Sequence, residues 1–269
     1  MRRIFAGCSK LRKVEYYAVK GADFSTLGKL TQVQELVGGL TDLNDISWIA
    51  ELPNLKKFSM FAEGVTDYTP LAKAKVEDLQ IWKMKNPVDL TQLSGATSLT
   101  KLKLWILTDA TGFEGLGSLV NLKELIFDGV NEKNGSVDLA FAKSLANLET
   151  LTLKRGVFLN SDSFGSLTKL KKLSCSDANI RGDIPFDLTF LAKTISLENL
   201  DISNSTVRNF DAVAGSEKLK QATLVKTSGV TSLGSLKKLP SLKGVVLSKG
   251  AFPDTEISGF GEKVKITQR

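Results

Sequence analysis

Few residue types in this sequence are suited to acid–base, nucleophilic or metal chemistry. The 269 residues include no histidine, so Ser-His-Asp and Cys-His systems and the commonest metal ligand are all missing. Adjacent carboxylates such as Glu77 and Asp78 have lysines close by in the sequence, which is typical of a solvated face. No G-x-x-x-x-G-K-[ST] loop occurs, and the glycines of GFEGLGS (112–118) lack the spacing of a dinucleotide-binding turn. We therefore expect no catalytic residue, no metal site and no cofactor.

The elements that position the side chains follow from a repeated pattern, L-x-x-L-x-L, which returns about every 22 residues. Other apolar residues often replace leucine. Eleven copies carry these residues in the three apolar slots: Leu11/Val14/Tyr16, Val33/Leu36/Gly38, Leu55/Phe58/Met60, Val76/Leu79/Ile81, Leu99/Leu102/Leu104, Leu122/Leu125/Phe127, Leu148/Leu151/Leu153, Leu170/Leu173/Cys175, Leu197/Leu200/Ile202, Leu219/Ala222/Leu224 and Leu242/Val245/Leu247. A weaker twelfth copy contains Val264 and Ile266.

One copy shows what each repeat builds. Seven of its residues are expected to point inward: Leu55, Phe58, Met60, Val65, Tyr68, Leu71 and Ala74. The L-x-L piece alternates as a short strand must, and the later steps of three fit a 3₁₀ turn or short helix. Because one such turn of chain cannot bury its apolar side alone, successive repeats stack with their strands parallel. Cys175 fills an apolar slot and is expected to be a small core residue, several repeats away from Cys8, so the two cannot share a zinc site.

The repeats resemble the leucine-rich repeat family, and 52–71 and 197–213 resemble its bacterial, internalin-like type. The resemblance implies an α/β fold: a right-handed solenoid of about 11–12 repeats, with a curved parallel sheet on its concave face. It also implies that the strands supply the contact residues. We expect a single domain over 1–269. The family's turn asparagine is missing from the expected slot, where Val130 and Ala178 stand, so the turn amides must find other partners.

Two copies are longer than the rest. The polar segment NEKNGS (131–136) is expected to form an exposed loop beside the sixth strand. The segment 180–196 is expected to contain a G-x-I-P turn followed by an extra helical stretch.

The amino-acid composition limits which classes of partner are expected. The net charge of +7 comes from lysine and arginine that are interleaved with aspartate and glutamate, which favours a solvated surface over nucleic-acid binding. No apolar run is long enough to span a membrane, and no signal peptide is visible, so a cytoplasmic location is expected. Secretion or surface display is the alternative. The oligomeric state is not indicated.

The outward strand positions carry the information about binding. Phe61, Trp82 and Trp105 fall at the same position in three consecutive repeats and are expected to form an aromatic row on the concave face. Charged and apolar residues surround them, which is the composition of a protein–protein hot spot. The expected partner-binding residues are Phe61, Trp82, Trp105, Lys83, Lys103, Ile126, Asp128, Lys154 and Arg155. Two alternatives remain: a one-residue shift would make the aromatics core residues, and the rings could merely stiffen the sheet.

These observations favour a non-enzymatic protein-binding scaffold that captures another protein on its concave face, as an inhibitor or immunity factor would. The alternatives are an internalin-like or effector-type host-interaction protein, and the substrate-recognition part of a larger enzyme. A partner protein is expected, its identity is not indicated, and neither nucleic acid nor a membrane span is expected.

Overall fold

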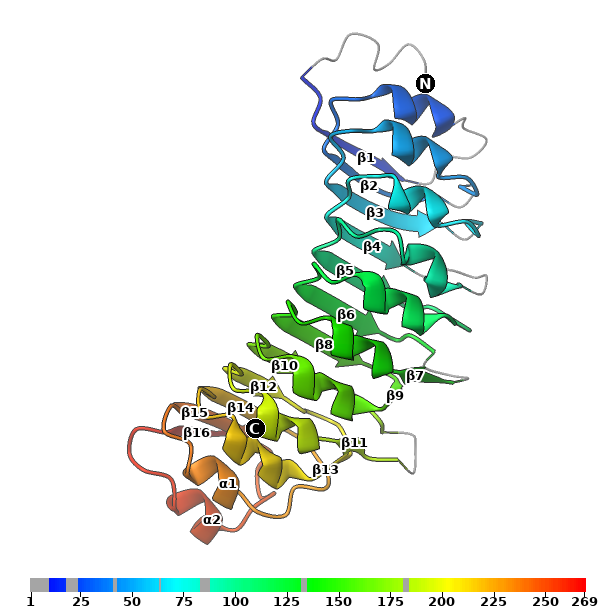
Figure 1. Cartoon of the computed structure of the whole chain (residues 1–269). Coiled ribbons are helices and arrows are strands. Elements are labelled where there is room, and N and C mark those ends of the chain that lie inside the picture. The colour runs from blue at the N-terminus through cyan, green and yellow to red at the C-terminus, as the bar shows by residue number, and fades with distance from the viewer. Residues whose placement is uncertain are drawn as a thin grey trace. The chain divides into compact units, whose positions relative to one another are not determined.

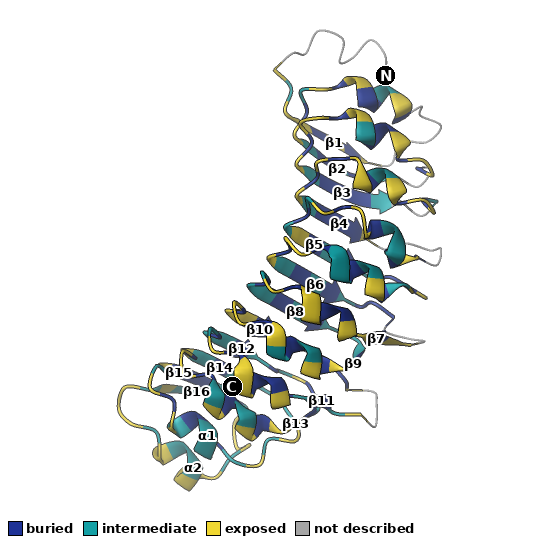
Figure 2. Ribbon diagram, viewed as in Figure 1, coloured by how far each residue is buried: buried dark blue, intermediate teal, exposed yellow. Residues whose placement is uncertain are grey.

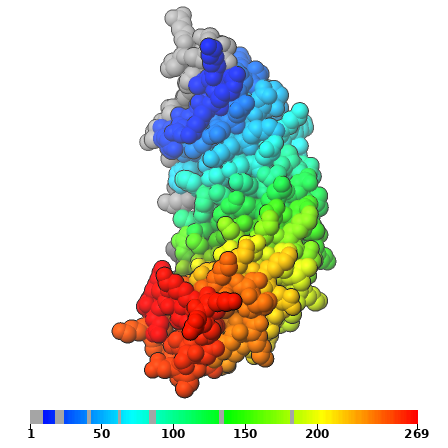
Figure 3. Space-filling model, turned by 90° about the vertical axis from the view of Figure 1, so that its left-hand side faces the viewer, coloured from blue at the N-terminus to red at the C-terminus, as the bar shows by residue number. Residues whose placement is uncertain are grey.

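A computed structural model describes residues 10–17, 24–40, 43–62, 64–82, 88–131, 135–180 and 184–269 (Figure 1). The chain divides into two compact units, residues 1–134 and 135–269. Each unit repeats one motif of a short parallel strand followed by a short return helix. Within each unit, repeats that are consecutive in the sequence lie side by side, as the order of the colours shows (Figure 3). A single domain over 1–269 stays a prediction.

The first unit contains six parallel strands within its described residues, paired in chain order. They are β1 (Lys13–Tyr17), β2 (Glu35–Leu40), β3 (Lys57–Ala62), β4 (Asp78–Trp82), β5 (Lys101–Trp105) and β6 (Glu124–Asp128). The returns are 3₁₀ helices η1 (Phe24–Lys29), η2 (Ser47–Glu51), η3 (Thr69–Ala72), η4 (Leu90–Leu93) and η5 (Phe113–Ser118).

The second unit contains six parallel strands paired in chain order and four more in two small pairs, again counting the described residues. The main strands are β8 (Thr150–Lys154), β10 (Lys172–Ser174), β12 (Asn199–Asp201), β14 (Gln221–Leu224), β15 (Gly244–Leu247) and β16 (Lys265–Gln268). The short strands form two small parallel pairs, β7 (Ser136–Asp138) with β9 (Val157–Leu159) and β11 (Phe186–Asp187) with β13 (Val207–Arg208). The returns are η6 (Ala140–Ser144), η7 (Ser161–Ser166), η8 (Thr189–Lys193), η9 (Phe210–Gly215), α1 (Gly234–Lys237) and α2 (Asp254–Ser258).

The core lies between the inner face of each sheet and its return helices, as the burial colours show (Figure 2). All seven residues expected to point inward in the repeat 55–74 are buried. The same holds for the apolar slots of the other copies, except that Leu11, Val264 and Ile266 are half-buried. The alternation of the strands is therefore confirmed. The residues between the apolar slots lie on the face of each sheet that is turned away from the return helices, which we call the outer face.

Aspartates begin many of the return helices. Asp45, Asp67, Asp89 and Asp187 each accept a hydrogen bond from the backbone N–H two residues later, at 2.7 to 2.9 Å. The residue that donates is a serine or threonine, and its hydroxyl also donates to the same carboxyl group. Because this side chain satisfies a backbone donor that the first turn leaves open, the D-x-[ST] spacing fixes where the return begins.

Trp48, on the return helix η2, is buried, and its indole N–H donates to the Asp45 carbonyl at 2.9 Å. Two sequence expectations concern single segments of the chain. The expectation of an exposed loop at 131–136 is wrong at its first residue, because Asn131 is buried. The extra helix expected within 180–196 is also wrong, because the helix among the described residues there, η8, is the ordinary return of that repeat.

Candidate functional site

Aromatic side chains gather at the ends of three neighbouring strands in the first unit. Phe61 lies on β3, and Trp82 and Trp105 lie opposite each other on β4 and β5. The two indole rings meet edge to face, with centroids 4.9 Å apart and an interplanar angle of 76°. Trp82 is 40% exposed, while Phe61 and Trp105 are half-buried. The predicted outward register is therefore confirmed, and the alternative in which these rings are core residues is excluded.

A shallow hollow of about 310 Å³ lies among these rings. Phe61, Trp82, Trp105 and Ile106 line it, so its walls are aromatic and aliphatic. Ile106 follows directly after β5 and is 43% exposed. We call these four residues the aromatic hollow. Apolar walls that remain open to water in a monomer are typical of a surface that another molecule covers.

The turn that carries Ile106 is fastened to the next repeat. The Ile106 N–H donates to the Asp128 carbonyl at 2.8 Å, and the Asn131 N–H donates to the Leu107 carbonyl at 2.8 Å. The buried Asn131 side chain also accepts from the Ala110 N–H and donates to the Ala110 carbonyl, both at 2.8 Å. Asn131 thus pairs the backbone of the turn from one position after the slot where the family has its asparagine. In the second unit, the Asn179 side chain pairs with the backbone of Phe158 in the same way.

The outer face at the start of the same strands alternates in charge. Directly paired positions on β1 to β6 read Lys13, Glu35, Lys57, Asp78, Lys101 and Glu124. Glu124 lies 3.6 Å from the Lys101 ammonium and 3.8 Å from that of Lys103. Such exposed pairs stabilise little individually, but opposite charges on neighbouring strands favour this pairing over a shifted one. The register that brings Trp82 beside Trp105 is supported by this row.

The other predicted contact residues fall into three groups. Lys103, Ile126 and Asp128 are half-buried on the outer face of β5 and β6, and Trp105 pairs with Asp128 across those strands. Lys154 and Arg155 are half-buried at the end of β8, in the second unit. Lys83 lies outside the described residues. Ile106 is a fourth wall of the hollow and was not among the predicted partner-binding residues.

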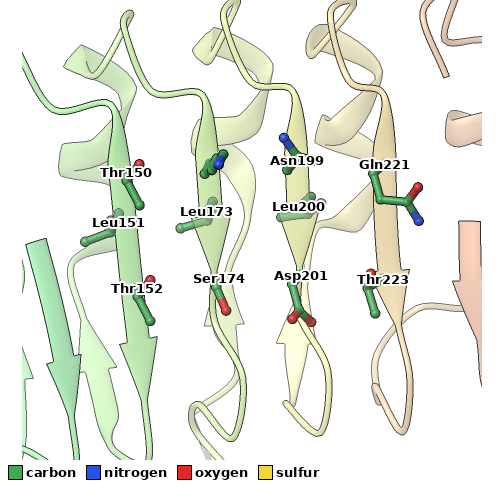
Figure 4. Close-up of a pocket in the computed structure, with 11 residues that line it drawn as sticks. Thr150, Leu151, Thr152, Leu173, Ser174, Asn199, Leu200, Asp201, Gln221 and Thr223 are labelled. Atoms are coloured by element: carbon green, nitrogen blue, oxygen red, sulfur yellow. The ribbon is translucent and has the colours of Figure 1, made fainter. Parts of the chain in front are cut away.

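The second unit has a different outer face, shown in Figure 4. A hollow of about 280 Å³ lies across β8, β10, β12 and β14. Its outward side chains are mainly short and polar: Thr150, Thr152, Ser174, Asn199, Asp201, Gln221 and Thr223, with Lys172 exposed among them. These groups can donate and accept hydrogen bonds, whereas the aromatic hollow offers mostly apolar contact.

The described residues offer little reactive chemistry. Burial, together with the charge of Asp201, raises the pKa of the Cys175 thiol well above its usual range, so this thiol stays protonated and inert. No group of three or more potential metal ligands of the Cys, Asp or Glu type occurs among the described residues. Within the same part of the chain, none of the helices has the length and apolar character that crossing a membrane requires.

The sequence matches no protein-family model and no curated protein. The fold is similar to that of solved bacterial proteins. An internalin from Listeria monocytogenes has a TM-score of 0.61 at 16% identity, covering 96% of this chain and 87% of that one. Internalin C2 from the same species has a TM-score of 0.55 at 22% identity, covering 81% of each chain. A leucine-rich repeat protein of Leptospira interrogans has a TM-score of 0.74 at 16% identity, covering 97% of this chain and 67% of that one.

These likenesses, with a twelve-stranded parallel sheet and mostly 3₁₀ return helices in the described residues, show a leucine-rich repeat solenoid of the kind found in internalins. The fold predicted from the leucine pattern is confirmed. At such low identities the likeness extends to the fold alone.

Proposed function

We propose that this chain is a non-enzymatic scaffold that binds another protein on the outer face of its first unit. Phe61, Trp82 and Trp105 form the energetic centre of that contact. The observation that supports the proposal most is the aromatic hollow itself, since two tryptophans and an isoleucine remain partly in water around a hollow on the outer face of the sheet. Tryptophan is among the residues that contribute most to protein interfaces.

The surroundings of the hollow supply the rim of such an interface. Lys103, Ile126 and Asp128 lie on the two strands that continue from it, and Lys83 is proposed with them from the sequence. For the second unit, the proposal extends only to Lys154 and Arg155 as charged contacts. Rim charges of this kind steer association and set specificity more than they add affinity.

Binding through a rigid surface would act by occlusion or by recruitment, without chemistry in the scaffold. We propose occlusion of the partner, as an inhibitor or immunity factor performs it. A chain without histidine, whose buried cysteine has a raised pKa, is suited to this role because it needs only shape and contact.

The test begins with capture of partners from the source cells by the wild-type protein and their identification by mass spectrometry. The affinity of each candidate is then measured by calorimetry against Trp82→Ala and Trp105→Ala. Each change should weaken binding by at least ~2 kcal/mol, which is about 30-fold. The free energy of unfolding should fall by no more than about 1.5 kcal/mol, the scale of one aromatic pair.

Tyr17→Ala is the matched control, because Tyr17 is an exposed aromatic residue on β1 that does not line the hollow. It should leave the affinity unchanged. If the tryptophan variants lose stability but keep their affinity, the rings only stiffen the sheet and the proposal is wrong.

A further inference from the structure

The backbone of Ile106 has a conformation that is unfavourable for isoleucine. Its φ angle is +51°, in the left-handed region. A branched Cβ makes this region costly for isoleucine, and valine, isoleucine and threonine adopt it rarely. The side chain does not recover that cost by burial, because it is 43% exposed. A strained and exposed apolar residue is therefore maintained at the edge of the aromatic hollow.

The equivalent turns of other repeats show which residue types this backbone conformation favours. The position two residues after the third apolar slot has positive φ in six repeats, occupied by Ile106, Gly129, Arg155, Asp177, Asn204 and Lys226. Glycine, aspartate and asparagine tolerate this conformation well. Among the described non-glycine residues with positive φ, Ile106 is the one with a branched Cβ. The turn geometry therefore does not explain the choice of isoleucine.

The strain persists because the turn is fixed from outside. Four hydrogen bonds of 2.8 Å join the segment 106–110 to Asp128 and Asn131 of the next repeat. Backbone strain of this kind is maintained only where the surrounding structure determines the conformation, and it gathers at functional sites.

We infer that Ile106 is held in this conformation so that its side chain completes the aromatic hollow, and that the occupant is an aliphatic or aromatic side chain of the partner protein. The inference rests on the proposed function and adds the chemistry of the contact. The indole rings of Trp82 and Trp105 attract cations, but the isoleucine wall adds nothing for a charged occupant. It also offers no hydrogen bond to a sugar, which needs polar groups around a stacking ring. An apolar side chain gains from all four walls.

The experiment uses the three tryptophan indole N–H signals of the full chain in ¹H–¹⁵N NMR spectra. Trp82 and Trp105 line the hollow, and the buried Trp48 serves as an internal control. The probes are N-acetyl-leucine amide, N-acetyl-phenylalanine amide, N-acetyl-lysine amide and methyl glucoside. The first two should shift the Trp82 and Trp105 signals and leave Trp48 unmoved. Larger shifts with the lysine amide or the glucoside, or no shift with any probe, would overturn the inference.

The variant Ile106→Asn separates strain from contact. Asparagine tolerates positive φ, so the melting temperature should rise by ~2–4 °C, while the shifts caused by the leucine amide should fall at least ~5-fold. Lys226→Asn is the matched control, because Lys226 has a φ of +53° at the equivalent turn and lines neither hollow. It should give a smaller rise in melting temperature, because lysine has no branched Cβ, and it should leave the shifts unchanged. A lower melting temperature for Ile106→Asn, or unchanged shifts, contradicts the inference.

This inference and the proposed function fail separately. If the leucine amide binds as expected but a captured partner is indifferent to Trp82→Ala and Trp105→Ala, the proposed function is wrong and the preference of the hollow stands. If a partner depends on both tryptophans but the hollow prefers the lysine amide, the proposed function stands and the apolar occupant is wrong.

Discussion

Replacing Asn131 by alanine should destabilise the first unit more than its position near a polar segment suggests. The change removes two hydrogen bonds of 2.8 Å and leaves both the N–H and the carbonyl of Ala110 unpaired. Ala110 is buried, so water does not replace the lost partner. An unsatisfied buried polar group costs ~1–3 kcal/mol, which gives about 2–6 kcal/mol for the pair.

The backbone adds a second contribution. Asn131 has a φ of +53°, where alanine is less stable than asparagine by about 1 kcal/mol. Asn131→Gly loses the same hydrogen bonds without this penalty, so it should be less destabilising than Asn131→Ala by about that amount. Comparing the two variants therefore separates the free energy lost with the side-chain hydrogen bonds from the free energy lost to backbone strain.

Urea unfolding followed by tryptophan fluorescence is the suitable assay, because all three tryptophans lie in the first unit. The matched control is Asn121→Ala, whose side chain donates to the Thr97 carbonyl at an exposed site, where loss should cost less than about 1 kcal/mol. If Asn131→Ala costs no more than Asn121→Ala, Asn131 does not fasten the turn, and the account of Ile106 loses its support.

Two further predictions concern the core and the charges. Leu102→Ala and Leu151→Ala each remove a fully buried side chain flanked by strands, and each should lower the free energy of unfolding by roughly 2–5 kcal/mol in urea; a loss below about 0.5 kcal/mol at both sites would disprove the register. For Asp187, burial opposes ionisation, but hydrogen bonds from Asn209 and Thr189 and the charge of Arg208 outweigh it and lower the pKa to about 2. The charged form therefore stabilises the fold above pH ~4, by at most about 2 kcal/mol for a partly exposed group, and this is lost as the pH falls toward 2. Asp187→Asn should be destabilised at pH 7 and approach the wild type near pH 2 in thermal melts, and an equal difference at both values would contradict this origin.

The leucine pattern predicts the strands and the core well, because burial on a stacked repeat dictates residue type at each inward slot. Leu55, Phe58 and Met60 could be placed inside from spacing alone, and each is buried. The outward position of Trp82 and Trp105 follows from the same alternation. Their role in binding is not dictated by folding, so it stays a prediction.

The turns were less predictable because their hydrogen bonds join residues from different repeats. The family's turn asparagine is missing from its expected slot, yet Asn131 and Asn179 perform its task one residue later. From the register alone, Ser248 is an outward position where alanine should be silent. The structure shows its hydroxyl accepting from the Lys226 N–H at 2.6 Å, so alanine there should cost about 0.5–1.5 kcal/mol.

The outer face of a stacked repeat is where residue types can change at little cost to the fold. In the second unit, those positions carry threonine, serine, asparagine and glutamine around β8 to β14, which remain hydrated without penalty. In the first unit, the equivalent positions near Trp82 and Ile106 leave large apolar side chains partly in water, and one of them is strained as well. Folding of the isolated chain gains little from either feature. A partner that covers the hollow would recover about 25 cal/mol for each Å² of apolar surface removed from water, which gives both features a physical reason.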